Sequence, residues 1–175
     1  MRGLERLAAV DRSTPPMAEA LPSLPMAQTV MIRLMRISVV GLGQFFEPVF
    51  RTLGLTETSF HVLCLLMAAE DGRASPSELS DLVGTSRANM TRVLDDLIET
   101  GLVQRASSTR DARRAVIQIT STGRSVAANA LPRLEQPLRR AFEDLSPDEF
   151  ASLETLLRKV IRAFDKGAQP LRTSA

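Results

Sequence analysis

The sequence predicts a mainly α-helical fold with a small β-hairpin, and three observations predict it. Apolar residues recur at helical spacing over several long segments. Serine or threonine followed by proline and acidic residues marks helix starts at more than one place. Beyond the middle of the chain, two short segments rich in valine and isoleucine flank a polar loop, which is typical of a hairpin.

The first part of the chain divides into an arm and a long helix. Residues 1–27 contain four prolines among small and charged residues, and we interpret them as a flexible N-terminal arm with a short helix at 3–10. Apolar residues at near-helical spacing then predict a long helix over 28–52. Gly54 follows directly and favours the end of that helix.

Two shorter helices follow, each with a clear start signal. Thr56 is a good N-cap for a helix over 57–70. The sequence SPSE, which begins at Ser75, combines a capping serine, a proline at the first helical position and a glutamate that closes a capping box. It predicts a short helix over 76–83, which Gly84 ends.

A helix, a hairpin and two further helices complete the chain. An apolar stripe predicts an amphipathic helix over 86–100, and 102–105 and 115–119 are the expected strands. A long helix is expected over 121–144, with a bend near Pro132 or Pro137. Ser146 starts another helix through a second capping box, and residues 167–175 are interpreted as a flexible tail.

This order of elements is that of a winged helix-turn-helix lobe, which we place at about 56–120. The long helices over about 28–52 and 121–165 carry apolar faces wider than one small lobe can bury. We therefore interpret them as a helical dimerisation region, so that residues 28–166 form one domain.

The composition excludes several classes of protein. Hydrophobic residues are 44% of the 175 residues, enough for a sizeable core, and the formal net charge is only +2. The single cysteine, Cys64, rules out an intrachain disulfide and favours a reducing compartment. Because no uninterrupted run of about 18 apolar residues occurs, we expect a cytoplasmic protein without a membrane partner.

The start of the helix over 86–100 has the composition of a recognition helix, which enters the major groove of DNA with its N-terminal residues leading. Arg87 can donate two hydrogen bonds to guanine, and Asn89 can pair bidentately with adenine. A solvated helix face is the alternative interpretation. The residues expected to contact bases or phosphates here are Thr85, Ser86, Arg87, Asn89, Thr91 and Arg92.

The hairpin loop adds positive charge to the same region. Residues 84–124 contain seven arginines against four acidic residues, so they carry a larger positive excess than the whole chain. Arg110, Arg113 and Arg114 lie at the expected loop tip, where long side chains can reach phosphates or a narrow minor groove. A solvated, charged hairpin is the alternative.

Four stretches in this order resemble the MarR family of regulators over about residues 30–165. They are LTETSFHVLCLL, SPSELSDLVGTSRANMTRVLDDLIETGLVQR, TRDARRAVIQITSTGRSV and LSPDEFASLETLLRKV. The most specific features are the recognition helix that leads into GLVQR, the wing sequence from Asp111 to Arg113, and the Thr-x-x-Gly motif from Thr120 to Gly123. The resemblance implies that Asp111 braces the wing and that Arg113 reaches the minor groove.

The resemblance further implies a homodimer whose first and last helices interleave with those of its partner. Such a dimer binds a pseudo-palindromic operator in double-stranded DNA. Members of the family are usually repressors that lose DNA affinity when a small aromatic acid or an oxidant acts, so an aromatic carboxylate is the expected effector. The effector site is expected between the dimerisation helices and the DNA-binding lobe, with Arg36, Arg51 and His61 as candidate ligand-binding residues.

Alternatives to an effector-released DNA-binding regulator remain. Cys64 can be a redox sensor, but it stands among apolar residues without a positive neighbour in sequence, so a small core residue is the favoured interpretation. His61 can equally be a structural histidine. One histidine and one cysteine cannot form a multi-histidine metal site, and we expect no metal, no cofactor and no enzymatic activity. A winged helix that binds protein instead of DNA is the remaining alternative.

Overall fold

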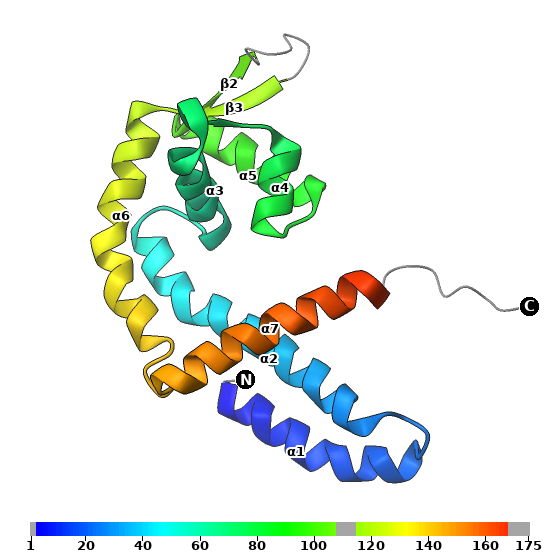
Figure 1. Cartoon of the computed structure of the whole chain (residues 1–175). Helices are drawn as coiled ribbons and strands as arrows, with labels where there is room; N and C mark the ends of the chain where they lie inside the picture. Colours follow the sequence, from blue (N-terminus) through cyan, green and yellow to red (C-terminus); the bar gives the residue numbers. More distant parts are fainter. Residues whose placement is uncertain (1–2, 108–114, 168–175) are drawn as a thin grey trace, which may run out of the picture. The chain divides into compact units, whose positions relative to one another are not determined.

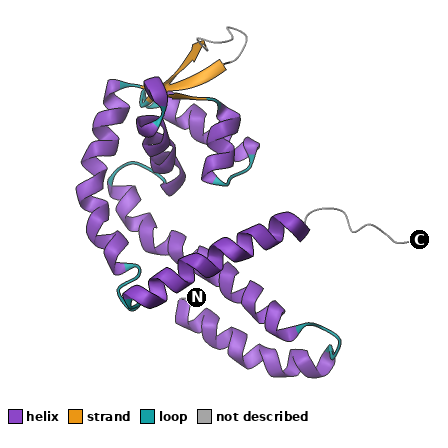
Figure 2. Ribbon diagram, viewed as in Figure 1, coloured by secondary structure: helices purple, strands orange, loops and turns teal. Residues whose placement is uncertain are grey.

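The structure is a computed structural model that describes residues 3–107 and 115–167. It consists mainly of helices with one small antiparallel sheet (Figures 1 and 2), which confirms the predicted fold class. The chain divides into two compact units, Met1–Glu135 and Gln136–Ala175, and each is described by itself below.

The N-terminal region is more helical than the sequence predicts. Helix α1 spans Gly3–Ala20 and packs on α2, which spans Met26–Thr52. Val10 is buried, and Arg33 of α2 donates a hydrogen bond of 2.6 Å from Nη2 to the Ser13 Oγ of α1. The expectation that helix is confined to 3–10 is therefore wrong. Prolines fix φ near the helical value, and packing against α2 lets the helix continue through them.

Three helices and a tight turn form the centre of the first unit. Helix α3 spans Glu57–Ala68, α4 spans Pro76–Val83 and α5 spans Arg87–Glu99. The expected end of α3 at residue 70 is wrong, because a 3-10 turn, η1, occupies Glu70–Gly72, where Asp71 has a positive φ of 56°. Helix α3 ends at Ala68 because its C-cap, Ala69, is extended, with ψ of 149°, and the positive φ of Asp71 prevents the helix from resuming.

The capping signals explain where these helices begin. The Thr56 hydroxyl accepts a 3.0 Å hydrogen bond from the Ser59 N–H, and the Ser59 Oγ accepts one of 2.8 Å from the Thr56 N–H. This is a reciprocal capping box. Ser75 caps α4 by accepting a 3.2 Å bond from the Glu78 N–H, with Pro76 at the first helical position.

A three-stranded antiparallel sheet combines the hairpin that follows α5 with a short strand that precedes α4. Strand β2 spans Val103–Ser107, β3 spans Ala115–Ile119 and the two-residue β1 spans Arg73–Ala74. The strand order is β1-β3-β2, so β3 is central. The sequence predicts the hairpin but not β1, because two residues are too few for an alternating pattern.

The core of the first unit lies where α3, α4 and α5 meet the sheet. Side chains from all four elements exclude solvent almost completely, so the recognition region is built on a rigid base. The largest fully buried side chains in this core are Val62, Leu63, Leu66, Leu79, Met90, Val103 and Ile117.

Two long helices complete the described chain. Helix α6 spans Ser121–Arg140 and α7 spans Pro147–Gly167. The prediction that the first of them reaches residue 144 is wrong. Its end tightens through bonds from the Phe142 N–H to the Arg139 carbonyl and from the Glu143 N–H to the Arg140 carbonyl, each spanning three residues.

Helix α2 is long and apolar enough to span a membrane by length and composition alone. Large apolar side chains on this helix are exposed in the single chain, among them Ile32 and Val39 at 50% and 70%. Two arginines, Arg33 and Arg36, interrupt its apolar sequence. An unpartnered apolar face with interspersed charge is also what a protein–protein interface requires, so this property does not by itself indicate a membrane.

Candidate nucleic-acid interface

The turn between α4 and α5 fixes where the recognition helix begins. Gly84 adopts a left-handed conformation, with φ of 72°, and its N–H donates to the Ser80 carbonyl. The Ser80 side chain is buried, and its Oγ donates a 2.7 Å hydrogen bond to the Thr85 carbonyl. Ser80 therefore holds both sides of the turn. Sequence reasoning missed it, because a serine on a short helix gives no signal of its own.

The N-terminus of α5 has a side-chain cap and a first turn without acidic residues. Ser86 is the N-cap, and its Oγ accepts a 3.2 Å hydrogen bond from the Asn89 N–H. The first turn contains no acidic residue, so the positive end of the helix dipole is not neutralised there. Arg87 and Thr91 are exposed, and the Thr91 hydroxyl donates to the Arg87 carbonyl at 3.0 Å.

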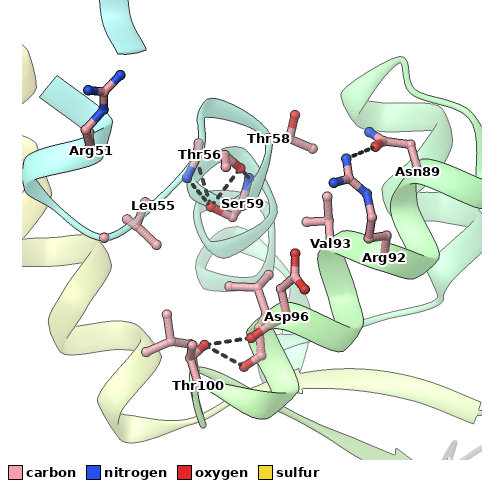
Figure 3. A pocket seen from close by; sticks show the side chains of 13 residues that line it. Arg51, Leu55, Thr56, Thr58, Ser59, Asn89, Arg92, Val93, Asp96 and Thr100 are labelled. Atoms are coloured by element: carbon pink, nitrogen blue, oxygen red, sulfur yellow. Dashed lines mark hydrogen bonds between the residues drawn. The ribbon is translucent and has the colours of Figure 1, made fainter. Parts of the chain in front are cut away.

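Three polar residues, one just before α5 and two on it, form a chain of hydrogen bonds. The Asn89 Nδ2 donates to the Thr85 Oγ1 at 2.8 Å. The Arg92 Nη2 donates to the Asn89 Oδ1 at 2.9 Å, the bond drawn between these two side chains in Figure 3. Asn89 keeps one N–H and one lone pair beyond these two bonds. Those are the groups that bidentate pairing with an adenine edge uses, so the chain orients Asn89 without saturating it.

The opposite side of α5 attaches the helix to the lobe. Met90, Val93, Leu94 and Leu97 are buried, as the predicted apolar stripe requires. Asp95 accepts a 2.9 Å ion-pair hydrogen bond from Arg105 of β2, so one acidic residue of the later turns helps connect α5 to the sheet. The structure thus brings Thr85, Ser86, Arg87, Asn89, Thr91 and Arg92 together at one end of α5.

The wing can be described only at its base. Strands β2 and β3 pair from Val103 with Ile119 to Ser107 with Ala115. The predicted tip residues Arg110, Asp111, Arg113 and Arg114 lie outside the described residues. Their contacts with DNA stay a prediction from the sequence.

A cleft of about 390 Å³ opens beside the recognition helix (Figure 3). One side comes from the end of α2 and the start of α3, and the other from α5. Its size falls within the ~300–1,000 Å³ that small-molecule sites occupy. The residues that line it are Arg51, Gly54, Leu55, Thr56, Thr58, Ser59, Asn89, Arg92, Val93, Asp96, Leu97, Thr100 and Leu102.

The three candidate ligand-binding residues do not come together. Arg51 lines the cleft and is also paired with Glu47 one turn earlier on α2. Arg36 and His61 are exposed on α2 and α3, and neither belongs to the lining of this cleft. Sequence reasoning did not connect Asn89, Arg92 or Asp96 with a ligand site, because the cleft joins segments about forty residues apart.

Cys64 lies on α3 and is partly buried. Burial raises the pKa of its thiol above the ordinary value of 9.0. A raised pKa lowers the thiolate fraction, and therefore the reactivity, at neutral pH. Within residues 3–107 and 115–167, no group of three or more histidine, cysteine, aspartate or glutamate side chains has a metal-binding arrangement.

Comparisons with known proteins agree with this architecture. The model of the MarR family matches residues 55–115. The chain is 33% identical over 145 residues to the transcriptional repressor MprA of Escherichia coli, a match that covers 83% of this chain and 82% of MprA.

Two solved structures are similar in fold and sequence. A mutant MarR of Escherichia coli complexed with operator DNA is 26% identical with a TM-score of 0.69, over 82% of this chain and 96% of that chain. The second is BpsR of Bordetella bronchiseptica, a protein whose DNA binding is regulated by 6-hydroxynicotinic acid. It is 25% identical with a TM-score of 0.66, over 73% of this chain and 89% of that chain. The chain therefore belongs to the MarR family and is a winged-helix transcriptional regulator, not an enzyme.

Proposed function

We propose that this regulator is a cytoplasmic repressor that binds a pseudo-palindromic operator as a homodimer and that a small aromatic carboxylate releases it. The observation that carries the proposal is the polar end of α5. There an exposed Arg87 and an oriented Asn89 stand beside a helix N-terminus without acidic residues. These groups match guanine, adenine and phosphate respectively.

The wing adds an electrostatic component to this surface. We expect Arg110, Arg113 and Arg114 to contact phosphates or the minor groove, and Asp111 to brace the loop, as the family resemblance implies. Each arginine that neutralises a phosphate steepens the logarithmic salt dependence of binding by roughly one unit. The relative bound to operator DNA supports placing DNA at this surface.

The apolar helices support the homodimer. Large apolar residues on α2 and α7 are exposed in the single chain, including Val39, Ile161 and Phe164. A second copy of the chain that covers these faces removes them from water, and twofold symmetry then presents two recognition helices about one DNA turn apart.

The effector is proposed from the cleft and from the relatives. Arg51 and Arg92 line a cleft large enough for a one-ring carboxylate. The regulation of BpsR by 6-hydroxynicotinic acid supports an aromatic acid as the class of ligand. Repression rather than activation rests on the similarity to MprA.

Operator binding tests the proposal most directly. Duplexes from the chain's own promoter region are titrated by fluorescence anisotropy, and a bound duplex is refined to its minimal operator. Arg87→Ala and Asn89→Ala should each weaken operator binding by about 1–3 kcal/mol and relax sequence preference at one position. Glu99→Gln, on the last turn of the same helix, is the matched control and should change binding little. If the sequence preference is unchanged in both Arg87→Ala and Asn89→Ala, these two residues do not recognise bases.

A ligand screen tests the effector. A compound that binds only the folded protein raises its melting temperature. Benzoate and its hydroxylated and nitrogen-ring analogues should raise the melting temperature and lower operator affinity. If no aromatic acid does either, the effector part of the proposal fails while operator binding stands.

A further inference from the structure

Two residues belong both to the cleft and to the surface expected to face DNA. Asn89 and Arg92 line the cleft, and they are also neighbours in the hydrogen-bond chain that starts at Thr85. A group that enters the cleft can therefore change the contacts of Asn89 without moving the lobe. Figure 3 shows the Arg92 guanidinium reaching back along α5 to the Asn89 amide.

One guanidinium group in the cleft, that of Arg92, is available to an anionic occupant. Two guanidinium groups, those of Arg51 and Arg92, line it with a single carboxylate, that of Asp96. Arg51 is paired with Glu47. Among the described residues, Arg92 has no ion pair within 4.0 Å, and its side-chain bond goes to the neutral amide oxygen of Asn89.

A carboxylate can outcompete that amide oxygen. A carboxylate can accept two parallel hydrogen bonds from a guanidinium and attracts it as an opposite charge, whereas the Asn89 amide oxygen is a neutral acceptor of a single bond. A carboxylate in the cleft therefore draws Arg92 away from Asn89. Asn89 then loses one of the two bonds that orient it, and ordering its side chain against adenine costs more conformational entropy.

We propose that Arg92 is a switch that couples a carboxylate in the cleft to base recognition by Asn89. The switch rests on the proposed function, because it requires Asn89 to contact bases. It adds a local route of regulation, in which the effector weakens sequence recognition through one side chain. If the effector instead weakens operator binding only by shifting the whole lobe, its effect does not depend on the hydrogen bonds of Asn89.

A tethered carboxylate tests the switch without knowledge of the effector. Thr58 lines the same cleft from α3 and is half-buried. Thr58→Glu brings a carboxylate to the cleft, and Thr58→Gln brings an uncharged side chain of equal length. The ratio of the operator dissociation constants of these two variants isolates the effect of the charge. It is measured once with Asn89 present and once in combination with Asn89→Ala.

The switch predicts unequal ratios. With Asn89 present, Thr58→Glu should bind the operator about tenfold more weakly than Thr58→Gln, and with Asn89→Ala the ratio should fall to about twofold or less. Repulsion between the new charge and DNA acts equally in both backgrounds. Equal ratios therefore overturn the switch.

A matched control separates the switch from recognition in general. Arg87 lies on the same turn of α5 and does not line the cleft, so the ratio in combination with Arg87→Ala should stay near tenfold. If neither Arg87→Ala nor Asn89→Ala alone weakens operator binding, the proposed function fails instead of the switch.

If circular dichroism shows that Thr58→Glu does not fold, a second measurement tests the switch in the wild-type chain. Benzoate is then added to the wild-type chain, and the side-chain amide signals of Asn89 are followed by NMR, assigned by their loss in Asn89→Ala. The switch predicts that these signals move on titration and that they do not move in Arg92→Gln. Signals that stay fixed in the wild-type chain overturn it.

Discussion

Gly123, near the start of α6, lies where no side chain fits. A Cβ there would collide with the Leu102 carbonyl oxygen and approach the Ile119 Cγ1 to 3.0 Å. Thr120 holds this contact, because its Oγ1 donates to the Gly101 carbonyl at 2.8 Å and accepts from the Gly123 N–H at 3.0 Å. The Thr-x-x-Gly motif is thus the joint between the hairpin and α6.

We predict that Gly123→Ala destabilises the protein by about 1–3 kcal/mol, because the backbone of Leu102 must move to admit the methyl group. Alanine normally stabilises a helix relative to glycine by about 0.5–1 kcal/mol, so the sign itself is diagnostic. Urea unfolding measures the change. Thr122→Ala, at the exposed neighbouring position, is the control and should stay within about 0.5 kcal/mol. A stabilised Gly123→Ala would contradict the close contact.

Cys64 illustrates what burial does to a thiol. Because burial raises its pKa above 9.0, less than about one-tenth of the thiol is ionised at pH 8. We predict that iodoacetamide modifies Cys64 at pH 8 more slowly than free cysteine, and that Cys64→Ala retains operator binding and effector response. Mass spectrometry follows the modification. Modification faster than that of free cysteine would revive the redox interpretation.

At the scale of elements, the sequence predicts those that local signals determine. Capping residues fix the start of α4, and the apolar stripe fixes the inner face of α5. The signals fail where tertiary contacts decide. Packing on α2 extends α1 through Pro15 and Pro16, and pairing with β3 creates β1 from two residues that no pattern identifies. Neither of these contacts can be predicted from the periodicity of apolar residues.

Helix α7 carries a pH-dependent cap. The Glu149 carboxylate accepts 2.8 Å hydrogen bonds from both the Ser146 N–H and the Ser146 hydroxyl, which lower the pKa of Glu149 below 4.5, the backbone bond contributing most. A depressed folded-state pKa stabilises the helix fully above the unfolded pKa, and this contribution is lost as pH falls through the folded-state value.

We therefore predict that the start of α7 frays as pH falls below about 4.5, and that Glu149→Gln removes this part of the pH dependence. Carbon-13 NMR of the Glu149 carboxyl measures its pKa directly. Ser146→Ala removes only the hydroxyl donor, so the pKa should rise part of the way to its ordinary value. A Glu149 that titrates at 4.5 in the wild-type chain would show that the cap is not formed in solution.

At the scale of the whole molecule, the two candidate sites differ in how far the sequence predicts them. The DNA-facing residues of α5 follow one another along the chain, so their residue types and helical position suffice. The cleft joins the end of α2, the start of α3 and one side of α5. The sequence predicts Arg51 as a ligand-binding residue and Arg92 as a DNA contact, but only the three-dimensional fold brings both to one cleft.

The exposed apolar face of α7 carries the last prediction. Leu157, Ile161 and Phe164 recur at intervals of four and three residues, so they form one stripe on the helix. Ile161 is 58% exposed in the single chain. If a second copy covers this stripe, Ile161→Glu places a charge in an apolar interface, where it has no partner and costs several kcal/mol.

Sedimentation equilibrium should give twice the chain mass for the wild type and a concentration-dependent shift towards the single-chain mass for Ile161→Glu. Operator affinity should fall as the dimer dissociates, because two DNA-binding lobes linked in one dimer bind the two half-sites more tightly than two separate chains do. Lys159→Glu places the same side chain two residues away, off the apolar stripe, and should remain dimeric although it changes the net charge by more. A wild-type chain that sediments as a monomer at micromolar concentration, or an Ile161→Glu variant that stays dimeric, would show that α7 does not form the interface.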